Sequence, residues 1–133
     1  LGLCHVNEFE GQAAMALESS VCTAYPMLNE KIGNLCFDWQ PLLQKLCTAS
    51  HTAEDIATEL HHSLIVWLFA VAEKSGVQKI VLSGGCFQNA YLVETIMKQP
   101  TAMNYQIYRH ANIPPNDGGL ALGQIYARLL EEL

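Results

Sequence analysis

The chain has 133 residues, of which 50% are hydrophobic and 15% are charged, and its formal net charge is −6. This apolar share excludes disorder over most of the length, because enough apolar surface is present to offset the entropy lost on ordering. A chain of this length accommodates one domain, or one lobe of a larger domain.

The charges and the apolar runs exclude two classes of partner. The chain has seven Lys and Arg residues but 13 Asp and Glu residues, and its basic residues form no cluster in the sequence. A nucleic acid is therefore not expected as a partner. The longest apolar run, Leu64 to Ala72, has nine residues, whereas a membrane span needs about 20. The first residues, LGLCHVNEFEG, lack the basic start and the long apolar core of a signal peptide, and we predict a cytoplasmic protein.

The cysteines indicate reduced thiols. Their number is odd, five, and no pair has the spacing C-x-x-C, so neither a disulfide framework nor a zinc knuckle is expected. We interpret them as small buried side chains of a cytoplasmic protein.

The first part of the chain predicts helices separated by turns. The sequence EGQAAMALESSV predicts a helix over residues 10–21, ended by Tyr25-Pro26. After it we expect a polar turn over 29–34, a short strand over 35–37 and a helix over 42–47 that Pro41 opens.

The clearest helix is predicted from about Thr52 to Ser75. Apolar residues recur there at steps of three and four, namely Ile56, Leu60, Leu64, Trp67 and Val71. Thr52 is its expected N-cap, Asp55 completes a capping box, and Gly76 is the expected stop. Its second half is apolar on all sides and is expected to be buried.

The remaining part of the chain predicts alternating strands and helices. A strand over 79–82 is followed by Ser83-Gly84-Gly85 and by a helix over 88–98. A second strand over 105–108 leads through two prolines and two glycines into a last helix that starts near Gly118. The fold class is therefore α/β, rich in helices, with a short and incomplete parallel sheet.

Two glycine turns are the main candidates for a site. The turn after the first strand could offer backbone N–H groups to a phosphate at the start of a helix, or it could be a plain turn. Asn89, one turn further, could reach a ligand over the glycines or cap the helix. Asp117, between two prolines and two glycines, could be an N-cap or a hard-oxygen ligand of a metal.

Other polar residues admit a structural interpretation as well as a functional one. His61 and His62 point about 100° apart on a helix, so they cannot both face one ligand; one could line a site while the other packs or meets solvent. Glu10 and Glu18 are about two helical turns apart, on a face that could contact a partner or only solvent. Cys86 could be reactive at a helix start, but sequence shows no base beside it, and packing is the preferred interpretation.

Four segments of the sequence carry a resemblance that covers essentially the whole chain. They are FEGQAAMALE at 9–18, LHHSL at 60–64, IVLSGGCFQN at 80–89 and PPNDGGLALGQ at 114–124. Together they resemble, in order and spacing, the C-terminal end of the hydrogenase maturation carbamoyltransferases of the HypF type.

The resemblance implies a fold and a reaction. The fold is the C-terminal lobe of a Kae1-like module with the two-lobe ATPase architecture of actin, sugar kinases and Hsp70, which binds ATP and a metal between lobes. A YrdC-like module makes carbamoyl adenylate from carbamoyl phosphate and ATP. The Kae1-like module then transfers the carbamoyl group to the C-terminal cysteine of the partner HypE, and dehydration gives the cyanide ligands of the [NiFe] centre.

The resemblance also implies site residues. Gly84 and Gly85 would face the nucleotide phosphates, Asn89 would lie near the ribose or adenine, and Asn116 would be a further nucleotide-binding residue. Asp117 would complete the site of a divalent metal, which could be Mg, Fe or Zn. Glu10 and His62 would be further residues of the pocket. The two turns, at 83–85 and 116–119, would have to lie side by side and face one opening.

Some parts of the family pattern lie upstream of this sequence. They are the metal-binding histidine pair, the first phosphate-binding hairpin and the acylphosphatase-like, zinc-finger-like and YrdC-like modules. The whole of residues 1–133 is thus expected to be a single lobe that is inactive alone. Cys86 stands where the family usually has a small apolar residue, which favours packing. Two alternatives stay open: a non-catalytic α/β interaction domain, and a relative of the tRNA threonylcarbamoyl-transfer proteins.

Overall fold

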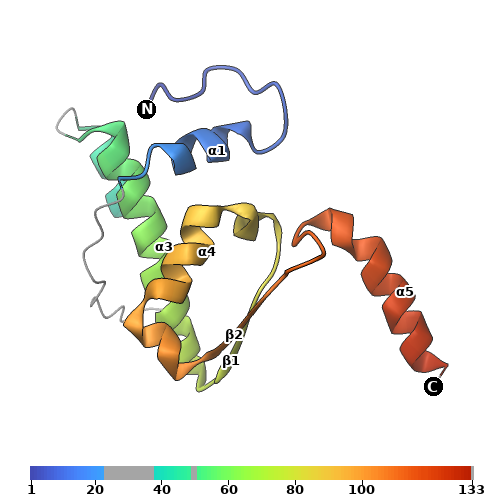
Figure 1. Cartoon of the computed structure of the whole chain (residues 1–133). Coiled ribbons are helices and arrows are strands. Elements are labelled where there is room, and N and C mark those ends of the chain that lie inside the picture. Colours follow the sequence, from blue (N-terminus) through green and yellow to red (C-terminus); the bar gives the residue numbers. More distant parts are fainter. Residues whose placement is uncertain (23–37, 49–50, 133) are drawn as a thin grey trace. The chain divides into compact units, whose positions relative to one another are not determined.

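The computed structural model of the chain describes residues 1–22, 38–48 and 51–132 (Figure 1). The chain divides into two units, Leu1–Gly76 and Val77–Leu133. The predictions for Tyr25-Pro26, for the polar turn over 29–34, for the strand over 35–37 and for Cys36 lie outside the described residues.

The first unit contains three helices, α1 (Gln12–Ser19), α2 (Gln40–Leu46) and α3 (Ala53–Ser75). Helix α1 begins two residues later than predicted, because its N-cap Gly11 has a left-handed backbone with φ of 85°. Glu10 therefore lies in the turn before the helix. The expectation that Glu10 and Glu18 share one helix face is wrong.

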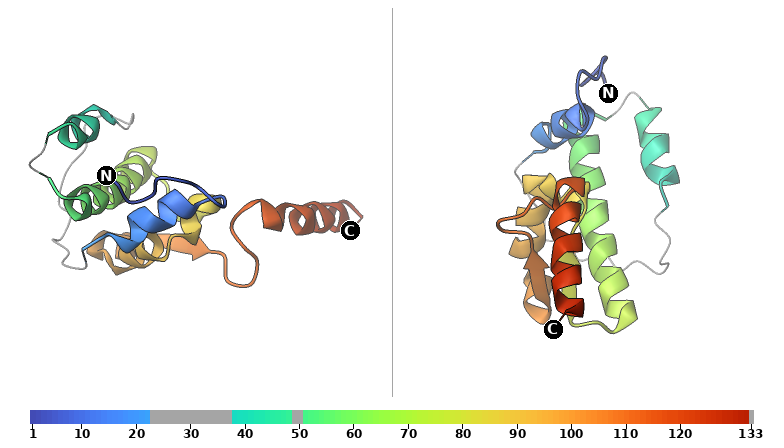
Figure 2. Two further views of the ribbon diagram at one scale, coloured as in Figure 1. Left: turned by 90° about the horizontal axis from the view of Figure 1, so that it is seen from above. Right: turned by 90° about the vertical axis from the view of Figure 1, so that its right-hand side faces the viewer.

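Helix α3 has the termini that the sequence predicts, and the right-hand view of Figure 2 shows it lengthwise as one long helix. Thr52 Oγ1 accepts a hydrogen bond from Asp55 N at 3.1 Å, and Asp55 Oδ2 accepts one from Thr52 N at 2.9 Å, which completes the capping box. Gly76 ends the helix with φ of 64°. Hydrogen bonds from the backbone and then the side chain of Thr52 lower the pKa of Asp55, so the carboxylate form is favoured in the folded chain.

The apolar half of α3 is only partly buried, which differs from the expectation of burial on every side. Ile65, Val66, Phe69 and Ala72 are buried, and the other five residues between 64 and 72 are half-buried. No residue from Leu64 to Ala72 is exposed, and Ile65 keeps only 1% of its surface. Burial of such side chains is the main stabilising contribution to a helix of this kind.

The second unit is an α/β arrangement around two parallel strands. Its elements in chain order are β1 (Lys79–Leu82), η1 (Gly85–Gln88), α4 (Ala90–Lys98), η2 (Pro100–Asn104), β2 (Gln106–Arg109), η3 (Asp117–Gly119) and α5 (Leu120–Glu131). Figure 1 shows β1 and β2 alongside each other, and the register pairs Ile80 with Ile107 and Leu82 with Arg109. The predicted short parallel sheet is confirmed, and among the described residues it has two strands.

The crossover between the strands differs in detail from the prediction. The 3-10 turn η1 follows the glycines directly, and α4 starts only after it, at Ala90. Leu82, Leu92 and Ile96 form the apolar core of this unit, with 1%, 7% and 0% exposure.

Helix α5 keeps a set of large apolar side chains in contact with solvent. They are Leu120, Leu122, Ile125, Tyr126, Leu129 and Leu130. Among the described helices, none combines the length and the apolar character that a membrane crossing requires.

The capping box of α3 predicts a stability effect at an exposed position. Thr52→Ala removes the acceptor of the Asp55 N–H and should lower the free energy of unfolding by about 1 kcal/mol. Chemical denaturation followed by circular dichroism measures the change. The matched control is Thr101→Ala, an exposed threonine in η2. Equal stability of the two variants would contradict the prediction.

Candidate functional site

The two glycine turns of the second unit lie side by side. The register places Leu82 beside Arg109 at the carboxyl ends of β1 and β2, so the segments that follow both strands leave from the same edge of the sheet. Gly84 N donates a hydrogen bond of 2.7 Å to Pro115 O, which ties the first turn to the loop before α5. Ligands of open parallel sheets bind at this kind of edge.

A cavity of about 500 Å³ opens at the junction of the two turns. Its lining comes from the end of β1, the segment after β2 and the first part of α5: Ser83, Gly84, His110, Pro114, Pro115, Asn116, Asp117, Gly119, Leu120, Gly123, Gln124 and Ala127. The expectation that the two turns face one opening is therefore confirmed. Of the expected nucleotide and metal residues, Gly84, Asn116 and Asp117 line this cavity, whereas Gly85 and Asn89 are not among its lining residues.

Glycine at position 84 permits an unusual backbone conformation and leaves open space beside the chain. Its φ of 99° is a conformation that side chains disfavour, and a Cβ there would point into open space. A ligand can therefore come close to the chain at this point. The Gly84 N–H itself donates to Pro115 O and is not available to a phosphate.

The second turn is held by Asn116, not by Asp117. Asn116 Oδ1 accepts a hydrogen bond of 3.1 Å from Gly118 N, and Asn116 is the N-cap of η3. The interpretation of Asp117 as an N-cap is wrong. Asp117 is exposed, and its carboxylate has no hydrogen-bond or ion-pair partner within the described part of the chain, which leaves both oxygens for a ligand.

A complete metal site is not found within residues 1–22, 38–48 and 51–132. No three His, Cys, Asp or Glu side chains of these segments lie close enough to hold one ion. Asp117 can contribute one hard oxygen ligand, so the other ligands of a metal would come from water, from a nucleotide or from protein outside these segments.

Asn89 is a helix cap. It is half-buried, and its Oδ1 accepts a hydrogen bond of 2.7 Å from Leu92 N at the start of α4. The structural interpretation of this residue is thereby confirmed, while a contact with ribose or adenine stays a prediction.

The cysteines differ from the expectation of buried side chains. Cys22, Cys47 and Cys86 are exposed, Cys4 is half-buried, and these four are free thiols. Cys86 belongs to the 3-10 turn η1 directly after Gly85, where the short turn keeps its side chain in solvent. The packing role assigned to Cys86 is therefore wrong.

The two further pocket residues, Glu10 and His62, belong to the first unit. Glu10 is exposed in the turn before α1. His61 and His62 are both buried in α3, with 4% and 8% exposure, and His61 Nδ1 lies 2.7 Å from Ala57 O. Burial, and then the neighbouring His61, lower the pKa of His62, so its neutral form is favoured.

Two lining residues were not among the candidates of the sequence analysis. Ser83 Oγ and His110 Nε2 lie 3.0 Å apart at the edge of the cavity. Each directly follows one strand, so the register of β1 and β2 brings them together. Only part of the signal was present in the sequence, because Ser83 directly follows the predicted strand over 79–82, whereas His110 stands two positions after the predicted strand over 105–108.

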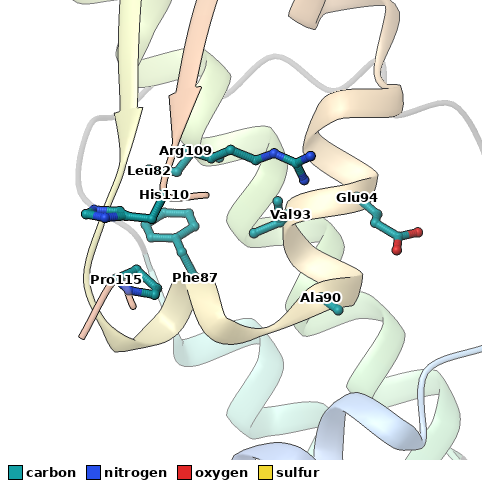
Figure 3. A pocket seen from close by; sticks show the side chains of 8 residues that line it. All are labelled: Leu82, Phe87, Ala90, Val93, Glu94, Arg109, His110 and Pro115. Atoms are coloured by element: carbon teal, nitrogen blue, oxygen red, sulfur yellow. The ribbon is translucent and has the colours of Figure 1, made fainter. Parts of the chain in front are cut away.

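A second, smaller cavity of about 200 Å³ lies between the end of β2 and α4 (Figure 3). Its lining includes Leu82, Phe87 and Val93, and Arg109 reaches across it toward α4, whereas His110 projects in the opposite direction. Glu94 pairs with Lys98 at 3.0 Å. Successive residues of a strand point to opposite sides, which is why Arg109 and His110 diverge.

Comparison with protein families and sequences identifies relatives over almost the whole chain. A family described as carbamoyltransferase, Kae1-like domain, second subdomain, matches residues 1–124. Carbamoyltransferase HypF of Synechocystis sp. is 35% identical over 136 residues, which is 97% of this chain and 18% of the relative. Carbamoyltransferase HypF of Rhodobacter capsulatus is 36% identical over 93% of this chain and 17% of its own length. The chain thus spans less than a fifth of these relatives.

Two crystal structures have a similar fold. A full-length HypF in the phosphate- and nucleotide-bound form superimposes with a TM-score of 0.74 and 26% identity, over 98% of this chain and 19% of that protein. The HypF of T. kodakarensis gives a TM-score of 0.62 at 21% identity, over 96% of this chain and 18% of that protein, a similarity that concerns the fold alone.

Alanine substitutions at Gly119 in the second turn and at Gly85 in the first turn are predicted to differ in their effect on stability. A Cβ on Gly119 would lie 2.9 Å from Pro114 O and 3.1 Å from Ile113 Cγ2, while a Cβ on Gly85 would meet nothing within 4 Å. Gly119→Ala should therefore lower the free energy of unfolding by about 1–3 kcal/mol, and Gly85→Ala should change it little. Thermal unfolding of both variants measures the difference. The opposite order of stability would contradict this packing.

The buried His62 predicts a loss of stability in weak acid. Its folded pKa lies below the ordinary value of 6.5, so the unfolded chain binds more protons between the two pKa values. The free energy of unfolding should fall as the pH drops from 7.5 through 6.5 toward the folded pKa. His62→Gln should flatten this dependence, and the exposed His5→Gln should retain it. Denaturation curves at several pH values test it, and a slope unchanged in His62→Gln would refute it.

Proposed function

The chain belongs to the family of carbamoyltransferase Kae1-like domains, as their second subdomain, and on this premise we propose that it forms part of a HypF-type carbamoyltransferase. The proposed reaction consumes carbamoyl phosphate and ATP and passes through a carbamoyl adenylate. The acceptor is the C-terminal cysteine of a HypE-type partner protein. The protein would act in the cytoplasm without a nucleic-acid partner.

The observation that carries the proposal is the junction of the two glycine turns. The Gly84–Pro115 hydrogen bond holds the turn after β1 against the loop before α5, and a cavity of about 500 Å³ opens there. This volume is within the range of about 300–1,000 Å³ that small-molecule sites occupy. The crystal structure with a TM-score of 0.74 is described as phosphate- and nucleotide-bound, which supports a nucleotide as the ligand here.

The residues of the cavity fit a nucleotide. The missing side chain at Gly84 allows a phosphate to approach the backbone closely. Gly85 is not a lining residue, but it adjoins Gly84 and begins η1, so its N–H lies at the start of a helical turn, where backbone amides have no partner within the turn. Asn116 and Gln124 add side-chain amides to the lining. In the proposed site these groups fix the nucleotide, and Asn89 supports them indirectly by capping α4.

A divalent metal fits the exposed carboxylate of Asp117. Mg, Fe and Zn all accept such an oxygen ligand, so the residue alone does not select among them. When bound, the metal would neutralise negative charge on the phosphate and so stabilise a leaving phosphate. Asp117 would anchor it beside Gly84, and Asn116, by capping η3, would hold Asp117 in place.

The transfer itself needs no covalent bond to this chain. The acceptor cysteine reacts as its thiolate, after its proton has passed to solvent. The thiolate sulfur attacks the carbamoyl carbon, the C–S bond forms, the bond from that carbon to the phosphate oxygen breaks, and AMP leaves with the electron pair. The task of this subdomain is to hold the adenylate so that its carbamoyl carbon is open to the sulfur. This role makes the second subdomain half of a two-lobe ATPase site of the actin, sugar-kinase and Hsp70 type, and inactive alone.

The test is the response of the full-length protein to loss of Asp117. Asp117→Ala should abolish carbamoyl transfer to the partner cysteine and remove the extra thermal stabilisation that ATP with a divalent cation gives over ATP alone. Glu131→Gln, an equal loss of charge on exposed α5, is the matched control and should retain both.

The outcomes separate the proposal from its alternatives. Normal transfer by Asp117→Ala would remove this residue from the site. A wild-type protein that ATP and a divalent cation do not stabilise would favour the non-catalytic interaction domain.

A further inference from the structure

The edge of the cavity holds a hydrogen-bonded pair that no part of the proposed site explains. Ser83 Oγ and His110 Nε2 lie 3.0 Å apart, both residues are exposed, and both line the cavity. The pair follows from the sheet, because Ser83 and His110 each stand one residue beyond the register pair of Leu82 and Arg109.

The lining of the cavity is poor in groups that attract an anion. Among the described lining residues there is no lysine and no arginine, and Asp117 is an acid. The N–H of Gly84 is already donated to Pro115 O. His110 is thus the only lining side chain of the described residues that can carry a positive charge, and Ser83 is the only hydroxyl.

We propose that Ser83 and His110 form an anion-binding pair for a phosphate group of the nucleotide, an inference that rests on the proposed function. His110 Nε2–H donates to Ser83 Oγ, and this leaves the hydroxyl proton of Ser83 to be donated to a phosphate oxygen. Ser83 is the contact residue, and His110 is a positioning residue that orients the hydroxyl.

The neighbours of His110 are compatible with this role. Arg109 precedes it and points to the other side of the strand, across the second cavity (Figure 3). Glu94, which also lines that second cavity, is paired with Lys98 at 3.0 Å. Asp117 lines the same cavity as His110 and would bind the metal. The hydrogen bond of His110 among the described residues is therefore directed to Ser83.

The decisive comparison is between AMP and adenosine, which differ by the phosphate alone. Calorimetric titration of the full-length protein should show that Ser83→Ala weakens AMP binding roughly tenfold to a hundredfold, the value of a hydrogen bond to a charged group. Adenosine binding should not change. His110→Gln should also weaken AMP binding and leave adenosine binding unchanged. The double variant should bind AMP as tightly as Ser83→Ala does, because the two residues act as a unit.

Matched variants control for folding. Ser83→Thr retains the hydroxyl and should retain AMP affinity. Ser75→Ala and His5→Gln, the same changes at exposed positions of the first unit, should leave both affinities unchanged.

Each outcome has one meaning. If Ser83→Ala binds AMP as the wild type does, or loses adenosine and AMP equally, the anion-binding pair is refuted while the nucleotide site stands. The pair is also refuted if the wild type binds AMP no more tightly than adenosine. If the wild-type protein binds neither ligand, nor ATP with a divalent cation, the proposed function fails, and the pair fails with it.

Discussion

The geometry of the site depends on one hydrogen bond between two turns that are distant in sequence. Gly84 N donates to Pro115 O at 2.7 Å, and the parallel register of β1 and β2 brings these turns to the same edge of the sheet. Without the register the turns would not meet, and without the hydrogen bond the loop before α5 would have no backbone anchor on the first turn. Gly84 accommodates this contact with a φ of 99°, a conformation that residues with a side chain rarely adopt.

The second turn is determined by close packing instead. Gly118 and Gly119 lie against Asn116 and Pro114 so tightly that a Cβ at either position would be within 3.1 Å of a neighbouring atom. The prolines restrict the approach to the turn, and Asn116 Oδ1 accepts a hydrogen bond from Gly118 N within it. The surroundings of the two glycine pairs therefore differ. A Cβ on either glycine of the first pair would meet open space, whereas a Cβ on either glycine of the second pair would press against neighbouring atoms.

Local signals in the sequence predicted those features that local interactions determine. The capping box of Thr52 and Asp55, the stop at Gly76, both strands and the α/β class are all confirmed. The predictions failed where tertiary contacts or a short 3-10 turn determine the helix start, the exposure of a side chain or the identity of the cap. Gly11 delays α1 and removes Glu10 from its face, η1 exposes Cys86, and Asn116 takes the cap position that Asp117 could have held. Ser83 and His110 were missed because their proximity is a property of strand register, which a single sequence does not specify.

The composition of the cavity limits how it can hold an anionic ligand. Its described lining residues include no lysine and no arginine, so these residues supply no strongly basic side chain to an anion. The proposed affinity must then come from short-range hydrogen bonds with fixed geometry and from the cation that Asp117 would hold. Such groups act best when the backbone that carries them is rigid, since each then needs little reorganisation as charge develops on the leaving phosphate. The Gly84–Pro115 bond and the tight packing at Gly119 bear on this requirement, because they constrain the backbone of the two turns from which the polar groups of the cavity project.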